Sequence, residues 1–234
     1  MGPKKRYYLK TPGKIIVAVL VLIVVFAILR IFKIGAVWRL LFGGNYYSNA
    51  DFGIEDYISS TDCDSDGIDD QTDILNGARA YVATKPYYKS KYYSGGYPDD
   101  QYGVCTDVVA QALLNAGYDL RELVDEDIRL HPDDYADDCG DKNIDFRRVR
   151  NLLIYFQHTA VSLTTDISEY EEWQGGDIVV FQGHIGIISD KRNKNGTPYM
   201  IHHGGTNGAG GLRPDYEEDI LELSGEVLGH FRIS

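Results

Sequence analysis

The sequence predicts an α+β domain in which N-terminal helices pack on a small antiparallel sheet, and three observations predict it. Helical patterns of apolar residues come first, at about 71–83, 105–116, 118–130 and 145–158. Short strand-like stretches follow in the last third, at 177–181, 184–190, 199–204 and 227–233. Gln182 and Gly183, between the first two of these stretches, are typical of a tight hairpin. Helices that precede an antiparallel sheet indicate the α+β class.

The N-terminal segment is basic and apolar. Residues 1–44 carry eight Lys or Arg side chains and no acidic one. Residues 15–29 form an uninterrupted apolar run, which covers about 22 Å of the roughly 30 Å hydrocarbon core of a bilayer. A second apolar stretch follows Arg30, and the flanking basic side chains reach toward the interfaces, so a transmembrane span is feasible. No convincing small-residue cleavage site follows, which favours an uncleaved signal anchor over a cleaved signal peptide.

The charge distribution predicts the topology and the domain boundaries. Five bases precede the apolar run and three follow it closely, which favours a cytoplasmic N-terminus and an exported C-terminal part. Residues 45–234 hold all 35 acidic side chains and only 15 of the 23 basic ones, a balance that argues against nucleic-acid partners. We therefore expect a single-pass protein of the cell membrane. Its parts are a basic cytoplasmic N-terminus, a transmembrane anchor with its flank, a tether and an extracytoplasmic domain, at 1–14, 15–42, 43–60 and 61–234.

Cys105 opens one of the predicted helices. Gly103 precedes it and Gly117 supplies the stop signal. One interpretation is a buried small hydrophobe, because Cys105 falls on the apolar stripe of the helix. The other is a reactive thiol, because the N–H groups and the dipole at a helix N-terminus favour an anion. We expect Asp107, in the first turn, to stabilise the helix rather than to take part in chemistry.

Three histidines lie in the predicted sheet. His184 begins a strand, and alternation puts it on the same face as Gly186, which leaves a gap where we expect a helix end to approach. His202 and His203 are adjacent, so they point to opposite faces and only one of them can join a site with His184. Strand histidines are often structural. A cysteine nucleophile, however, needs a base within reach and a third group that orients the base.

The motifs "GVCTDVV", "GDIVVF-x-GHIGIISD" and "MIHH" resemble those of the NlpC-type cysteine peptidases, bacterial peptidoglycan hydrolases with a papain-like core. Within that superfamily the chain looks most similar to a YijF-like family of domains of unknown function. The resemblance implies that Cys105 is the nucleophile, that His184 is the base and that His202 is the third residue, with His203 as the alternative. It also implies amide cleavage in cell-wall peptides by a membrane-anchored hydrolase that needs no cofactor for catalysis.

Other functions are compatible with the same residues. Cys105, His184 and His202 are chemically acceptable zinc ligands, and the same fold also serves non-catalytic wall binding or calcium-dependent adhesion. The tyrosine-rich stretch 87–97 is where we expect substrate contacts, Tyr93 and Tyr97 in particular. Ordinary aromatic packing is the equal alternative for both tyrosines.

The acidic stretch "DCDSDGIDDQTD" resembles a calcium-binding loop of the EF-hand or thrombospondin type. It places carboxylates at positions 1, 3, 5, 9 and 12 and glycine at position 6. The predicted ligands are Asp62, Asp64, Asp66, Asp70 and Asp73, for a structural calcium ion. The alternative is an acidic turn that caps the following helix.

Two further cysteines lie in acidic segments. In an exported protein, Cys63 and Cys139 are candidates for a disulfide that would leave Cys105 as the single free thiol. Two free cysteines are an equal alternative, because the sequence does not give the distance between them.

Overall fold

The structure is a computed structural model that describes Ile16, Val19 and residues 46–205, 216–218, 221 and 225–233. The chain divides into two units, and the second, residues 46–234, contains the α+β fold. The predicted anchor at 15–42 lies outside the described residues, apart from Ile16 and Val19. No helix within the described ranges is long and apolar enough to cross a membrane.

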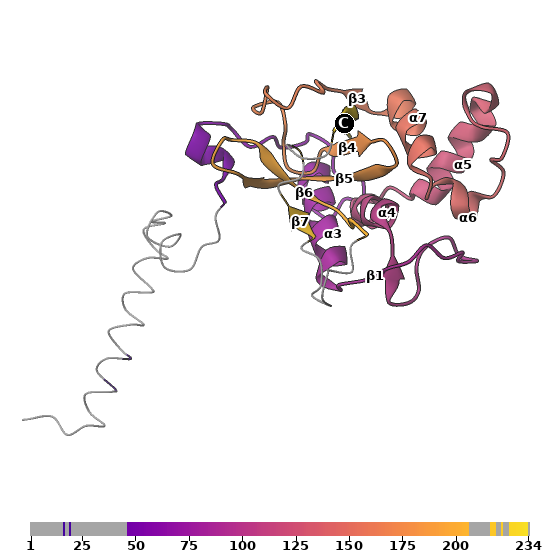
Figure 1. Ribbon diagram of the computed structural model, residues 1–234, viewed down its shortest axis with the longest axis horizontal. Coiled ribbons are helices and arrows are strands. Elements are labelled where there is room, and N and C mark those ends of the chain that lie inside the picture. Colours follow the sequence, from indigo (N-terminus) through magenta and orange to yellow (C-terminus); the bar gives the residue numbers. More distant parts are fainter. Residues whose placement is uncertain are drawn as a thin grey trace, which may run out of the picture. The chain divides into compact units, whose positions relative to one another are not determined.

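A six-stranded sheet forms the centre of this unit (Figure 1). Its strand order is β3-β8-β4-β5-β6-β7, and every neighbouring pair is antiparallel. The strands are β3 (Val161–Ser162), β4 (Ile178–Phe181), β5 (His184–Arg192), β6 (Pro198–Ile201), β7 (Glu217–Glu218) and β8 (Val227–Arg232). The predicted hairpin is confirmed, because Phe181 pairs with His184 and Gly183 adopts a φ of 72° in the turn.

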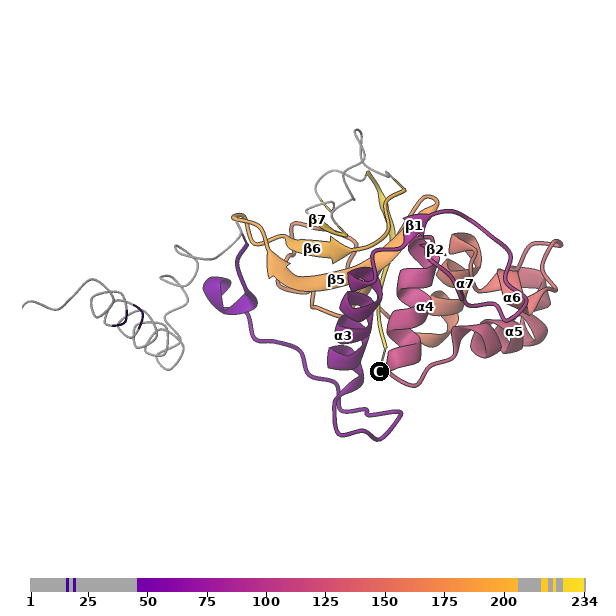
Figure 2. The ribbon, with the colours of Figure 1, turned by 90° about the horizontal axis from the view of Figure 1, so that it is seen from below.

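The predicted helices are also present, and with the antiparallel sheet they confirm the α+β class. They are α3 (Asp70–Ala83), α4 (Cys105–Asn115), α5 (Leu120–Leu130), α6 (Lys142–Asp145) and α7 (Val149–Thr159), with a short 3-10 helix η2 (Pro132–Asp134) after α5. Helices α3 and α4 run side by side against β5 (Figure 2). Helices α5, α6 and α7 group beside α4 at one end of the sheet (Figure 1).

The two faces of β5 belong to different parts of the core. Ile185 and Ile187 pack in the cluster that contains Cys105 and the apolar face of α4. Ile188, on the opposite face, packs in a second cluster around Trp173. Strand alternation thus separates the helix-facing residues from those that face away from α4.

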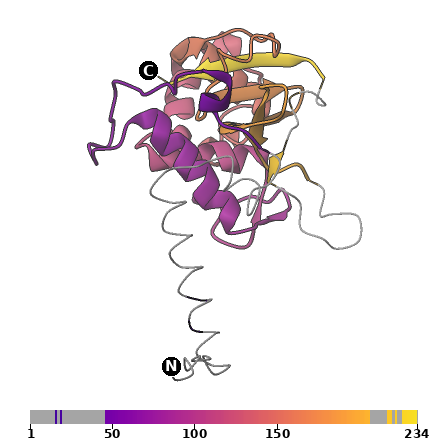
Figure 3. The same ribbon diagram turned by 90° about the vertical axis from the view of Figure 1, so that its left-hand side faces the viewer.

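The segment expected to be a tether packs on the sheet from Tyr46 onward. The 3-10 helix η1 (Asn49–Phe52) contacts β5, as Figure 3 shows in indigo, and Tyr47 exchanges main-chain hydrogen bonds of 2.7 Å with Arg192. The buried guanidinium of Arg192 donates to Asn49 and to three main-chain carbonyls. All four acceptors are neutral, and burial lowers the pKa of Arg192 to about 10.

Candidate active site

Cys105 is the first residue of α4, and the chain around it is held tightly. The main-chain N–H of Val104 donates to Asp107 Oδ2 at 2.8 Å, which closes the N-terminus of the helix. A Cβ at Gly103, two residues before the helix, would lie 2.1 Å from the hydroxyl oxygen of Tyr81, so a side chain there would have to displace the tyrosine. The position of Cys105 is therefore fixed by its own segment.

Asp107 has the structural role that the sequence predicts. It is fully buried and receives two hydrogen bonds from Arg147, from Nε at 2.7 Å and from Nη2 at 2.9 Å. Arg147 also donates to the carbonyl of Lys91 at 2.6 Å. This bidentate pair ties the N-terminus of α4 to the segment before α7.

The thiol of Cys105 lies against the first residues of β5. Its side chain is buried, with 6% of its surface exposed, and the main-chain N–H donors of Ile185 and Thr106 lie close enough to favour the thiolate. Burial raises the pKa of the thiol, and these two donors offset the increase only in part. The free protein therefore holds Cys105 as a neutral thiol, next to the residue that follows His184.

His184 and His202 form a direct pair. Nε2 of His184 and Nδ1 of His202 are 2.9 Å apart, and the two rings meet edge to face. Burial lowers the pKa of both rings, that of His202 to about 4. Both imidazoles are therefore neutral near pH 7. Because the bond uses Nε2 of His184, Nδ1 is the atom of that ring that remains to take a proton.

Gly186 accounts for this pairing, and it corrects one expectation. A Cβ at Gly186 would lie 2.6 Å from the carbonyl oxygen of Ile201 and 3.0 Å from Cβ of His202. The gap beside His184 thus admits the following strand, whereas a helix end was expected there. Helix α4 instead approaches the opposite face of β5, where Ile185 and Ile187 lie.

The structure distinguishes the two adjacent histidines. His203 is buried between the rings of Tyr88 and Tyr216, with centroid distances of 5.0 and 5.2 Å, and makes no contact of this kind with His184. Burial raises the pKa of the Tyr88 hydroxyl, and the charges of Cys105 and Asp107 raise it further. His203 therefore packs between two tyrosines, and one of them, Tyr88, lies within electrostatic reach of Cys105.

Cys105 packs against β5 at Ile185, the residue that follows His184. Within residues 46–205 no hydrogen bond joins Sγ to either ring of the histidine pair. Catalytic hydrogen bonds in ligand-free enzymes are often long and shorten only when substrate binds. Among the described residues, the groups of side chains whose ligand atoms lie within 4.8 Å of one another do not include Cys105.

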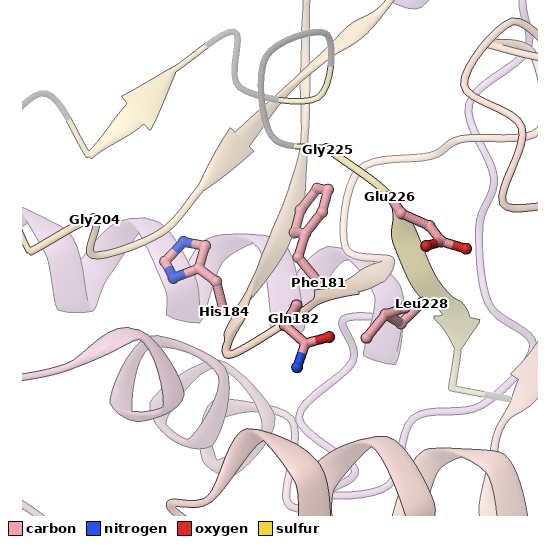
Figure 4. A pocket seen from close by; sticks show the side chains of 7 residues that line it. All are labelled: Phe181, Gln182, His184, Gly204, Gly225, Glu226 and Leu228. Carbon is pink, nitrogen blue, oxygen red and sulfur yellow. The ribbon is translucent and has the colours of Figure 1, made fainter.

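A groove leads from His184 along the β4–β5 hairpin. A cavity of about 450 Å³ lies between this hairpin and β8, and Figure 4 shows the side chains that line it, with His184 and Gly204 at one end. A second cavity of about 680 Å³ shares the lining residues Phe181, Gln182 and Leu228 with the first. It extends to the start of α7, where Arg148 and Arg150 line it. The combined groove therefore has a histidine at one end and two arginines at the other.

The tyrosines expected to contact substrate have their polar atoms used within the fold. The Tyr93 side chain is buried, with its hydroxyl donating to Asp100 at 2.8 Å and its ring under the guanidinium of Arg147. The hydroxyl of Tyr97 donates to Asp119 at 2.6 Å, and its ring packs on Phe146. The structure thus assigns both rings to packing.

The acidic loop gathers three of its five predicted ligands. Carboxylate oxygens of Asp62, Asp64 and Asp66 lie within 4.8 Å of one another. Asp73 lies in the first turn of α3, where burial and the charges of the loop carboxylates raise its pKa to about 6. Asp70 points elsewhere, since its oxygens accept from the N–H of Cys63 at 2.8 Å and from the hydroxyl of Tyr118.

All three cysteines are free, which is the second of the two alternatives for Cys63 and Cys139. Cys63 is exposed beside Gly117, in the turn after α4. Sγ of Cys139 accepts from the side-chain amide of Asn151 in α7 at 3.4 Å.

A further polar cluster was not found from the sequence. Asp127 and His131, at the end of α5, meet His158 near the end of α7, and Nδ1 of His158 lies 2.7 Å from Asp127 Oδ2. The same oxygen accepts from the hydroxyl of Tyr135. The spacing of four between Asp127 and His131 is a signal that they share a helix face, but nothing local points to the distant His158.

Comparison with known proteins gives a family and a relative. Residues 75–233 match the family model described as a domain of unknown function, DUF1287. The chain is similar to the uncharacterized protein YijF of Escherichia coli (strain K12), with 35% identity over 172 residues, which cover 68% of this chain and 80% of that protein. No solved structure matches.

Proposed function

The chain belongs to the DUF1287 family, and from the arrangement of Cys105, His184 and His202 we propose that it is a cysteine hydrolase with an NlpC-type, papain-like core. Its proposed substrate is an amide bond in the peptides of cell-wall peptidoglycan. The observation that carries the proposal is the 2.9 Å contact between His184 Nε2 and His202 Nδ1, together with a thiol at a helix N-terminus that packs on the residue after His184.

The protonation states fit a general-base mechanism. The neutral His184 accepts the thiol proton at Nδ1 while Sγ attacks the amide carbon, and His202 holds the ring through Nε2. The tetrahedral intermediate collapses when His184 returns the proton to the amine, which leaves a thioester on Cys105. Water, deprotonated by His184, then hydrolyses the thioester and restores the thiol.

The oxyanion of the tetrahedral intermediate needs donors that are in place before the reaction. The main-chain N–H of Cys105 is one, because the first N–H groups of a helix have no partner within the helix. We assign the second to the hydroxyl of Tyr88, which lies within electrostatic reach of the thiol.

The groove supports an extended substrate. A peptide that enters beside His184 continues past Phe181 and Leu228 toward Arg148 and Arg150. Both arginines are already paired with acidic residues of this chain, so the groove supports a peptide of extended shape and does not specify its charge. The apolar segment at 15–42 supports membrane anchoring, which holds the hydrolase close to the wall.

The test is digestion of purified peptidoglycan by the full-length protein, with mass spectrometry of the soluble products. We expect the wild type to release new peptide fragments and Cys105→Ser to release none. Cys139→Ser is the matched control, because it also removes a free thiol and keeps an acceptor for Asn151. Equal digestion by wild type and Cys105→Ser would overturn the proposal. If the protein is instead a non-catalytic wall-binding module, the wild type and Cys105→Ser should both sediment with the wall and neither should cleave it.

A further inference from the structure

We propose that the loop at 62–73 binds one calcium ion through the carboxylates of Asp62, Asp64, Asp66 and Asp73, together with the carbonyl of Ile68. This site is separate from Cys105 and does not depend on the proposed hydrolase function. Asp70, one of the ligands that the sequence predicts, is left out because both of its oxygens already accept hydrogen bonds. Ile68 is included because calcium loops use the main-chain oxygen of their seventh residue.

Three ligands already converge in the exposed part of the loop. Both oxygens of Asp62 point inward, where they accept from the N–H groups of Asp66 at 3.2 Å and Gly67 at 3.0 Å. Asp66 in turn accepts from the N–H of Ile68 at 2.8 Å. Gly67 has a φ of 94°, so the sixth position of the loop uses the conformation that glycine supplies.

The observation that points to a cation is the state of Asp73. Its side chain is buried, with 3% of its surface exposed, and Oδ2 has no hydrogen-bond partner. The charged groups that act on it are Asp66, Asp64 and Asp62, in that order, followed by Asp69. A buried carboxylate oxygen without a donor, facing further carboxylates, is unfavourable unless a cation lies between them.

Lys and Arg side chains of the described residues do not balance the charge of these carboxylates. Across the described ranges, no ion pair joins Lys or Arg to the four proposed carboxylates. The cluster of Asp127, His131 and His158 is different, because there the carboxylate already accepts from Tyr135 and contacts His158. Among the described carboxylates, the one with a buried oxygen that lacks a hydrogen-bond partner is therefore Asp73, at the loop.

The chemistry of the donors favours calcium. Every proposed ligand is an oxygen, and calcium takes six to eight oxygen ligands in flexible geometry, whereas magnesium demands a near-ideal octahedron. A loop that supplies one main-chain and four carboxylate oxygens, with water completing the shell, suits the larger ion. Zinc, which favours nitrogen and sulfur, is a poorer match.

Calcium at this site links the loop to both helices beneath β5. Figure 2 shows the loop leading into α3 and reaching toward the end of α4. A Cβ at Gly117 would lie 3.1 Å from Cβ of Asp64, and the amide of Asn115 donates to the carbonyl of Asp73 at 3.1 Å. The ion thus stabilises the helix that carries Cys105 from the end opposite to the thiol.

The experiment is a titration of calcium into the full-length protein after chelation, with thermal unfolding measured in parallel. We expect a dissociation constant of about 10⁻⁴ M and a Tm increase of about 4 °C in 1 mM calcium. Asp64→Asn and Asp73→Asn should each weaken binding by about tenfold or more. Glu55→Gln is the control, since it removes an exposed acid outside the loop and should bind calcium as the wild type does.

Asp73→Asn should change the unfolding temperature in opposite directions without and with calcium, which a purely structural acidic turn does not predict. Without calcium the variant should unfold at a higher temperature than the wild type, because a repelled carboxylate is gone. With calcium it should unfold at a lower one. The proposal is overturned if the wild type gives no binding heat and no Tm shift with millimolar calcium. It is equally overturned if magnesium binds as tightly, or if Asp64→Asn binds calcium unchanged.

Discussion

His184 begins β5 and His202 follows β6, yet their rings meet through a contact of 2.9 Å between Nε2 and Nδ1. Gly186 permits this approach, because any side chain there would collide with Ile201 and with His202. The contact leaves His184 Nδ1 for proton transfer and fixes the plane of its ring. The proposed catalytic roles of both histidines follow from this relationship.

His202→Ala should lower kcat by about 100-fold or more, because His184 loses the group that orients it. His202→Gln should retain a larger part of the activity, since its side-chain amide is able to bond Nε2. Both variants are assayed by the rate of peptide release from peptidoglycan. His131→Ala, at an exposed histidine, should leave the rate unchanged. Equal rates for His202→Ala and the wild type would contradict the orienting role.

The acidic limit of activity should lie below pH 6.5. His184 acts as a base only when its ring is neutral, and burial lowers its pKa from the usual value of 6.5. The neutral form thus persists to lower pH, and activity is lost only as the pH falls through the depressed pKa. The measurement is kcat/KM against pH. If the midpoint of the acidic limb of this profile lay above pH 6.5, the active base would have a raised pKa.

Alkylation of Cys105 should be slow at neutral pH and should accelerate above pH 9. The thiolate is the reactive form, and burial raises the thiol pKa above its usual value of 9.0. Iodoacetamide labelling of each cysteine, followed by peptide mass spectrometry over a pH series, gives the rates. The exposed Cys63 serves as the internal reference. Rapid labelling of Cys105 at pH 6 would indicate a thiolate–imidazolium pair in the free protein.

Arg147→Met should lower the free energy of unfolding by about 3–5 kcal/mol, because it leaves the buried carboxylate of Asp107 without its partner. Urea unfolding measures the change. Arg150→Met is the matched control, since it breaks an exposed pair with Asp138 and should have little effect. A similar small effect for both variants would show that the Asp107 pair does not hold the N-terminus of α4.

Much of the fold is predictable from local patterns. The main helices and strands follow from apolar periodicity, and the Gln182–Gly183 hairpin follows from its turn residues. Strands of two residues, such as the parallel pair β1 (Tyr87–Tyr88) and β2 (Tyr102–Gly103), are too short to show a period. Local sequence patterns likewise do not predict the packing of residues 46–60, because it depends on the buried Arg192 far along the chain.

In the candidate site, too, some features are predictable from the local sequence and others depend on tertiary contacts. The sequence identified Cys105 by its place at a helix start and limited the partner of His184 to one of two histidines, but only the fold distinguishes His202 from His203. The packing of Tyr93 depends on Arg147, which approaches from a distant segment. Such tertiary partners leave no trace in local spacing.

We expect Cys105 to carry the acyl group during cleavage, and rapid acid quenching followed by intact-protein mass spectrometry detects that adduct. The full-length protein is mixed with a peptidoglycan peptide and quenched during turnover. We predict a transient mass increase equal to the acyl fragment, located on the peptide that contains Cys105. Hydrolysis of the substrate at an unchanged rate by Cys105→Ser, with no adduct on the wild-type cysteine, would contradict the account.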